Sequence, residues 1–134
     1  MFLFGKKSKK KLEGTNEVVQ RVCKRALEIS TVDFSIIDGF RTQKQQKKMF
    51  DKGASELDGT MRISDHQTGM AVDVIPYIRG MDVWDTKDLA VRSAWLEIYR
   101  AFMRAAMQED VQLEFGLGYN ISGGRDWPHI SFKG

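Results

Sequence analysis

Both histidines of this 134-residue chain stand close to aspartates, in segments whose composition is typical of turns and strand ends. His66 lies in the stretch SDHQTGMAVDV, and His129 lies in DWPHISF near the end of the chain. In the first stretch Asp73 interrupts a short apolar run, where burying an unpaired carboxylate would cost several kcal/mol. Asp73 therefore needs a compensating positive charge, which an arginine or a metal ion could supply.

The two histidines and Asp73 together could bind a metal ion. Gly69 allows the chain to fold back, so that His66 in a loop can approach Asp73 in the strand that follows. His129 belongs to a strand that could lie beside strand 71–75. Two imidazoles and one carboxylate are a common ligand set for catalytic zinc, with one tetrahedral position left open. The residues alone leave two interpretations: a zinc site formed by His66, Asp73 and His129, or polar residues satisfied at strand ends.

Four further residues could complete a hydrolytic site. Asp126, three residues before His129, is the candidate general base, which would take the proton of the attacking water and pass it to the leaving amine. Arg41 follows a Gly-Phe turn and could stabilise an oxyanion or bind a substrate carboxylate. Ser64 could orient a metal ligand or a substrate carboxylate. Trp127 could line the substrate groove or simply pack.

The spacing of apolar residues predicts a single α+β domain, in which helices pack against a small, largely antiparallel sheet. Thr42 and Gln45 form a capping box that starts the second helix, Gly53 is placed to end that helix, and Thr86 is the expected cap of the long helix. The expected helices span residues 16–29, 42–50 and 86–108. The expected strands span residues 33–38, 71–75, 113–115 and 127–132.

Much of the formal net charge of +3 lies near the N-terminus, where KKSKKK spans Lys6 to Lys11. We expect residues 1–14 to form a basic N-terminal arm and residues 15–134 to form the folded domain. The arm could be solvated and frayed, or it could contact a polyanion. The single cysteine, Cys23, lies on the apolar face of the first expected helix, which predicts a buried thiol.

The two histidine segments resemble the motif pair of a zinc peptidase family, the D-alanyl-D-alanine carboxypeptidases and L-alanyl-D-glutamate endopeptidases. That pattern reads Ser-x-His-x-x-Gly-x-Ala-x-Asp, followed downstream by acid-x-x-His. Every fixed position is met here, by Ser64, His66, Gly69, Ala71, Asp73, Asp126 and His129. The stretch IIDGFRTQKQQKKMFDKGAS resembles the strand, turn and helix that carry the family's arginine, here Arg41. The opening of the chain is similar to that of small phage endolysins, so the resemblance covers nearly the whole sequence.

This resemblance implies zinc ligation by His66, Asp73 and His129, with Asp126 as the catalytic base, in a peptidase domain of residues 15–134. It implies cleavage in the peptide stem of peptidoglycan, and the phage branch implies a cut between L-alanine and D-glutamate that lyses the host. Removal of the terminal D-alanine by a carboxypeptidase on the same site is the alternative. The family often has Trp after the glycine-rich strand, where this chain has Tyr119. That position is expected to shape the substrate groove.

The rest of the sequence limits compartment and partners. No apolar run approaches the roughly 20 residues of a membrane-spanning helix, and MFLFG is too short for the apolar part of a signal peptide. We therefore expect synthesis in the host cytoplasm and no stable membrane insertion. Action on the cell wall would follow permeabilisation of the membrane by a separate protein. We expect peptidoglycan as the partner, no nucleic acid, and a monomer.

Two other classes of protein are weighed against this interpretation. A wall-binding or phage structural module without activity would lack a ligand or the base, and none is missing. A nucleic-acid-binding protein would need a positive face beyond the first dozen residues. The rest of the chain mixes Lys and Arg with at least as many acidic residues.

Overall fold

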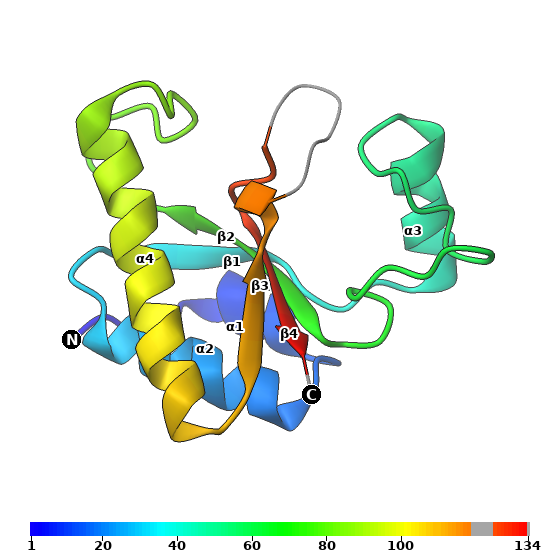
Figure 1. Ribbon diagram of the computed structural model, residues 1–134, viewed down its shortest axis with the longest axis horizontal. Helices are drawn as coiled ribbons and strands as arrows, with labels where there is room; N and C mark the ends of the chain where they lie inside the picture. The colour runs from blue at the N-terminus through cyan, green and yellow to red at the C-terminus, as the bar shows by residue number, and fades with distance from the viewer. Residues whose placement is uncertain (119–124, 134) are drawn as a thin grey trace.

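The computed structural model describes residues 1–118 and 125–133, which fold as helices around one antiparallel sheet (Figure 1). The α-helices are α1 (Lys6–Leu12), α2 (Glu17–Ile29), α3 (Gln43–Asp51) and α4 (Leu89–Gln108). The strands are β1 (Phe34–Asp38), β2 (Ala71–Pro76), β3 (Gln112–Phe115) and β4 (His129–Lys133), with a short 3₁₀ turn, Gly116–Gly118, after β3. The expected α+β class is confirmed. One expectation, a groove role for Tyr119, lies outside the described residues.

The sheet brings the two histidine segments together. Its strand order is β1-β2-β4-β3, and every neighbouring pair is antiparallel. In the register of the two central strands, Asp73 of β2 lies opposite His129 of β4. The prediction that the last strand lies beside strand 71–75 is therefore confirmed, although the two segments are far apart in the sequence.

Helices α2 and α4 pack together and supply most of the helical part of the core. Alternation along β4 places Ile130 and Phe132 in that core and turns His129 and Ser131 the other way. Cys23 is fully buried, as predicted, and so are Trp95 and Phe102. Burial raises the pKa of the Cys23 thiol far above its ordinary value, so this thiol stays protonated. Helix α3 lies on the other side of the sheet from α4 (Figure 1).

Local capping chemistry explains where the helices begin. The predicted capping box of α3 is present: the Thr42 hydroxyl accepts the Gln45 N–H, and the Gln45 side chain accepts the Thr42 N–H. The predicted start of the long helix was two residues too early, because Asp88 rather than Thr86 caps α4. The Asp88 carboxylate accepts the N–H groups of Ala90 and Val91. A series of turns over residues 81–88 delays the start of the helix.

The N-terminal segment differs from the solvated, frayed arm that the lysines suggested, because residues 6–12 form helix α1. All five lysines are exposed, while Ser8 and Leu12 are buried against the rest of the protein. The Ser8 hydroxyl accepts the backbone N–H of Ile36, so α1 is bonded to strand β1. The run of lysines concealed this helix, since only two of its residues face inward. Among the described helices, none is long and apolar enough to cross a membrane.

Gly39 stands where the chain leaves β1 and passes close to α1. A Cβ atom at this position would overlap the carbonyl oxygen of Lys11 and come within 3.3 Å of the Thr15 side chain. The absence of a side chain therefore lets the turn lie against the end of α1. The position also matters for the site, because the Gly39 carbonyl is bonded to His66.

We predict that Gly39→Ala lowers the free energy of unfolding by roughly 1–3 kcal/mol, because the added methyl group overpacks this contact. Urea denaturation followed by circular dichroism measures the change. Gly5→Ala is the matched control, since a Cβ at Gly5 meets open space. Equal losses in the two variants would contradict the proposed contact.

Candidate metal centre and active site

Three side chains from distant parts of the sequence converge at the centre of the sheet. His66 comes from the loop before β2, Asp73 from β2, and His129 from the first position of β4. Nε2 of His66 lies 3.2 Å from Oδ1 of Asp73 and 3.2 Å from Nδ1 of His129. Nδ1 of His129 lies 3.3 Å from the same Asp73 oxygen. The three atoms thus form a nearly equilateral triangle.

The outer nitrogen of each imidazole has its own hydrogen-bond partner, and the partner of His66 determines which of its nitrogens carries the proton. Nδ1 of His66 lies 2.7 Å from the Gly39 carbonyl oxygen, which can only accept, so Nδ1 carries the proton. Nε2 of His129 lies 2.6 Å from the Ser131 hydroxyl. In neutral His66 the lone pair is therefore on Nε2 and points toward the Asp73 carboxylate. His129 directs its Nδ1 lone pair to the same place when the Ser131 hydroxyl accepts the Nε2–H. Such a concentration of electron density requires a cation or protons at its centre.

The triangle fits a tetrahedral divalent metal ion. Zinc binds imidazole nitrogen and carboxylate oxygen at about 2.0–2.2 Å, which places neighbouring ligands of a tetrahedron roughly 3.4 Å apart. The observed edges of 3.2, 3.2 and 3.3 Å are close to that separation. Three protein ligands leave one tetrahedral position for another molecule, as in catalytic rather than structural sites. The donor set therefore fits the metal that the sequence predicted.

Asp73 is held ionised by its surroundings. Burial would raise the pKa of this carboxyl group, but hydrogen bonds to His129 and His66 lower it well below its usual range. Burial would likewise lower the pKa of His66, yet the hydrogen bond and charge of Asp73 raise it. The sequence offered an arginine or a metal ion as the counter-charge of Asp73. The structure provides for both, because Oδ1 faces the imidazoles while Oδ2 lies 3.4 Å from Nη2 of Arg41.

Arg41 lies at the centre of a buried polar network. Besides its contact with Asp73, its Nε donates to Asp38 over 2.6 Å and its Nη1 donates to Gln46 over 2.9 Å. Asp38 also accepts the N–H of Gly39, so it both holds the arginine and caps the turn. The guanidinium is therefore balanced by two carboxylates and is rigidly positioned beside the triangle.

Gln46 was not identified from the sequence, although its side chain is fully buried. It accepts from Arg41 and donates to the Ser55 hydroxyl and to the Leu57 carbonyl oxygen. It thereby ties helix α3 to the loop that follows. The only sequence signal was a polar residue on the inward side of a lysine-rich helix.

Asp126 lines the same cavity as the triangle, as do Ser64 and Arg41. The volume of this cavity is about 480 Å³. Burial and the charge of Asp73 raise the pKa of Asp126 above its ordinary value. A carboxylate with a raised pKa, next to an open metal position, is suited to exchanging protons with a water molecule.

Ser64 supports the loop that carries His66. Its hydroxyl accepts the backbone N–H of His66 over 3.2 Å, and its own N–H donates to the Gln67 side chain. Trp127 lies elsewhere: it lines a second cavity of about 580 Å³, together with Trp84, Arg92, Arg125 and Pro128. The Trp127 ring also stacks on Tyr99. Trp127 thus both packs against Tyr99 and lines a cavity, but this cavity is not the one that contains the triangle.

Asp65, the neighbour of His66, is partly exposed and has specific partners. Its carboxylate forms an ion pair with Lys133 at 2.7 Å. Burial would raise the pKa of Asp65, but hydrogen bonds from Lys133 and Ser131 lower it below its usual value. Since Ser131 also contacts Nε2 of His129, Asp65 supports one imidazole through a serine hydroxyl. The adjacent residues Asp65 and His66 thus both contribute to the triangle, His66 directly and Asp65 through Ser131.

The α+β fold, with an open His–Asp–His group beside a carboxylate of raised pKa, is typical of metal-dependent hydrolases. The family model described as phage L-alanyl-D-glutamate peptidase matches residues 1–130. The chain belongs to this family, which confirms the resemblance found in its motifs.

Two individual relatives agree with this assignment. The chain is 37% identical over 122 residues to the L-alanyl-D-glutamate peptidase of Escherichia phage T5, covering 91% of this chain and 85% of that protein. It is also similar to the crystal structure of the Serratia marcescens L-Ala D-Glu endopeptidase ChiX, with a TM-score of 0.77 and 30% identity. That match covers 98% of this chain and 90% of ChiX.

We predict that Gln46→Leu lowers the free energy of unfolding by about 2–3 kcal/mol, because it leaves buried partners without hydrogen bonds. The partners affected are Arg41, Ser55 and the Leu57 carbonyl. Thermal and urea denaturation measure the loss, with Gln108→Leu on the exposed end of α4 as the control. A variant as stable as the control would show that this network contributes nothing.

Proposed function

We propose that this protein is a zinc-dependent L-alanyl-D-glutamate endopeptidase that cleaves the peptide stem of peptidoglycan, as a phage endolysin does. The observation that carries the proposal is the triangle of His66, Asp73 and His129, with Asp126 in the same cavity. Membership of the phage L-alanyl-D-glutamate peptidase family supplies the substrate class. Both named relatives favour the endopeptidase over the carboxypeptidase alternative.

The proposed ligands are Nε2 of His66, Nδ1 of His129 and Oδ1 of Asp73. A zinc ion held there would supply Lewis acidity, polarising the scissile carbonyl and lowering the pKa of water. Gly39 and Ser131 fix the orientation and tautomer of the two imidazoles. Protons would be released as the ligands bind the ion, so zinc affinity should fall at low pH.

The remaining polar residues of the cavity have separate proposed roles. Asp126 takes the proton of the attacking water and passes it to the nitrogen of the leaving D-glutamate. Each nitrogen of Arg41 uses one N–H in the contacts described above, so one N–H on each Nη remains to stabilise a developing oxyanion. Ser64 holds the His66 loop in place.

The proposal extends to partner and location. Peptidoglycan is the proposed partner, reached from the host cytoplasm after another protein has permeabilised the membrane. The five exposed lysines of α1 carry positive charge that could attract an anionic envelope polymer. A substrate groove beyond the cavity could include Trp127, through the cavity that this residue lines.

The proposal predicts that purified protein releases new N-terminal D-glutamate from peptidoglycan. A chelator should abolish this release and added zinc should restore it, because the lone pairs of the site require the ion. Mass spectrometry of the digested wall identifies the termini. Free D-alanine in place of D-glutamate would make the protein a carboxypeptidase, and an intact wall after incubation with zinc-loaded protein would refute the wall-peptidase function.

The role of Asp126 can be separated from metal binding. We predict that Asp126→Asn retains stoichiometric zinc in equilibrium dialysis but loses about 10²- to 10⁴-fold in kcat, the usual contribution of a general base. Asp110→Asn is the control, since Asp110 is exposed on the turn after α4. Near-normal activity of the Asp126 variant would assign the base to another residue.

A further inference from the structure

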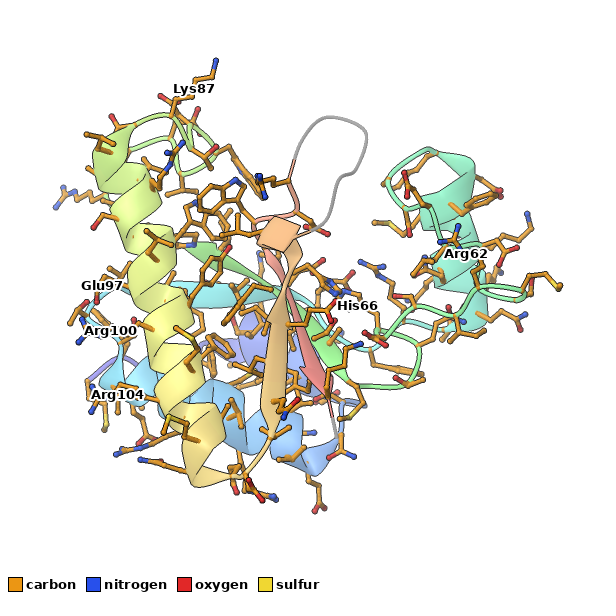
Figure 2. All side chains as sticks on the ribbon, in the orientation of Figure 1. Arg62, His66, Lys87, Glu97, Arg100 and Arg104 are labelled. Carbon is orange, nitrogen blue, oxygen red and sulfur yellow. The ribbon has the colours of Figure 1, made fainter. Side chains whose placement is uncertain are left out.

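The cavity that contains the triangle also contains a second guanidinium, which belongs to Arg62. Arg62 lies in the loop between α3 and β2, is exposed, and lines this cavity together with His66, Asp73, Asp126 and His129. In Figure 2, Arg62 and His66 lie toward the α3 side of the molecule. On the other side, Arg100 and Arg104 lie along α4 and Lys87 lies just before its start. Arg62 is thus a cation next to the proposed reaction centre.

Arg62 differs from Arg41 in its charge balance. Arg41 is buried and forms ion pairs with Asp38 and Asp73, so its charge is compensated within the protein. In the described part of the chain, residues 1–118 and 125–133, no carboxylate forms an ion pair with Arg62, although exposed Glu56 lines the same cavity. The positive charge of Arg41 is therefore neutralised by the protein, whereas the positive charge of Arg62 can interact with a bound ligand.

The backbone around Arg62 is fixed relative to the His66 loop. The Asp58 carboxylate accepts the N–H of Arg62 over 2.9 Å and that of Thr60 over 3.0 Å. The Arg62 carbonyl accepts the N–H of Gly59, and the Gly59 carbonyl accepts from the Gln67 side chain over 2.9 Å. The loop thus presents Arg62 from a position that is bonded to the segment carrying a proposed metal ligand.

The substrate of the proposed reaction carries a matching anion. In the stem peptide the chain continues through the γ-carboxyl of D-glutamate, so its α-carboxylate is free. That carboxylate is attached to the same carbon as the nitrogen of the bond to be cut. When the scissile bond lies beside Asp126 and the triangle, the carboxylate must enter the same cavity. Arginine binds carboxylates through paired, charge-assisted hydrogen bonds.

We propose that Arg62 binds the free α-carboxylate of D-glutamate on the leaving side of the scissile bond, and so determines specificity for unamidated stem peptides. This inference rests on the proposed endopeptidase function. It assigns recognition of the substrate anion to Arg62, and it leaves Arg41 to the reacting carbonyl. The enzyme should therefore distinguish D-glutamate from its α-amide, which has the same shape but no negative charge.

The test uses two soluble stem peptides that differ only at this group. One carries the α-carboxylate of D-glutamate, and the other carries the α-carboxamide. Wild-type protein loaded with zinc should cleave the carboxylate peptide with a kcat/KM roughly ten- to a hundredfold higher, the range expected for hydrogen bonds to a charged group. Arg62→Gln should lose that factor on the carboxylate peptide and retain its rate on the carboxamide peptide. Arg62→Lys should recover part of the preference.

The carboxamide peptide serves as the internal control for structure, because damage to the loop would slow both substrates equally. Arg104→Gln removes the same charge from the distant, exposed face of α4 and should change neither rate. Equal cleavage of the two peptides by wild-type protein, or an equal loss on both in Arg62→Gln, would overturn the role of Arg62 while leaving the endopeptidase function intact. Cleavage of neither peptide by wild-type protein would overturn the proposed function, and this inference with it.

Discussion

The negative charge of Asp73, set in a strand whose neighbours are apolar, is the constraint on which the rest of the site depends. Its side chain is only 17% exposed, so solvent cannot stabilise the charge as it would on the surface. One oxygen faces two imidazoles and the other faces Arg41. Because each partner comes from a different element, satisfying this one carboxylate joins the His66 loop, strand β4 and the turn before α3.

The residues of the site are held in place by hydrogen bonds from a second set of residues around them. The Gly39 carbonyl fixes one imidazole, and Ser131, itself bonded to Asp65, fixes the other. Gln46 holds Arg41 from helix α3. These contacts set the directions of the lone pairs, so the geometry of the triangle is prepared by the protein before any ion binds. The same turn at Gly39 must lie against α1, which connects the N-terminal helix to the histidine.

The cavity is lined by two arginines, Arg41 and Arg62, whose positive charges have different surroundings. Arg41 is compensated and rigid, which suits stabilisation of charge that develops only during reaction. Arg62 is exposed on an anchored loop and has charge available for a ligand that arrives already negative. A metallopeptidase that acts next to a glutamate needs both functions within a few bonds of one another. In the proposed function, two arginines with different surroundings would meet this need without placing two uncompensated charges beside the His–Asp–His group.

The sequence by itself determined the α+β class and the positions of most elements, because apolar periodicity is a local property of the chain. It named the converging triad through the resemblance of its two histidine motifs to a known family, since spacing alone left two interpretations. It did not reveal helix α1, because five of the seven residues of that helix are lysines and only Ser8 and Leu12 are buried. It also misplaced the cap of α4, because Thr86 and Asp88 are both residue types that cap helices well. The contacts of Gln46 and Asp65, and the place of Arg62 in the cavity, depend on loops meeting side chains that are distant in sequence. Only the tertiary structure decided these, because burial and charge balance are properties of the surroundings that the fold creates around a residue.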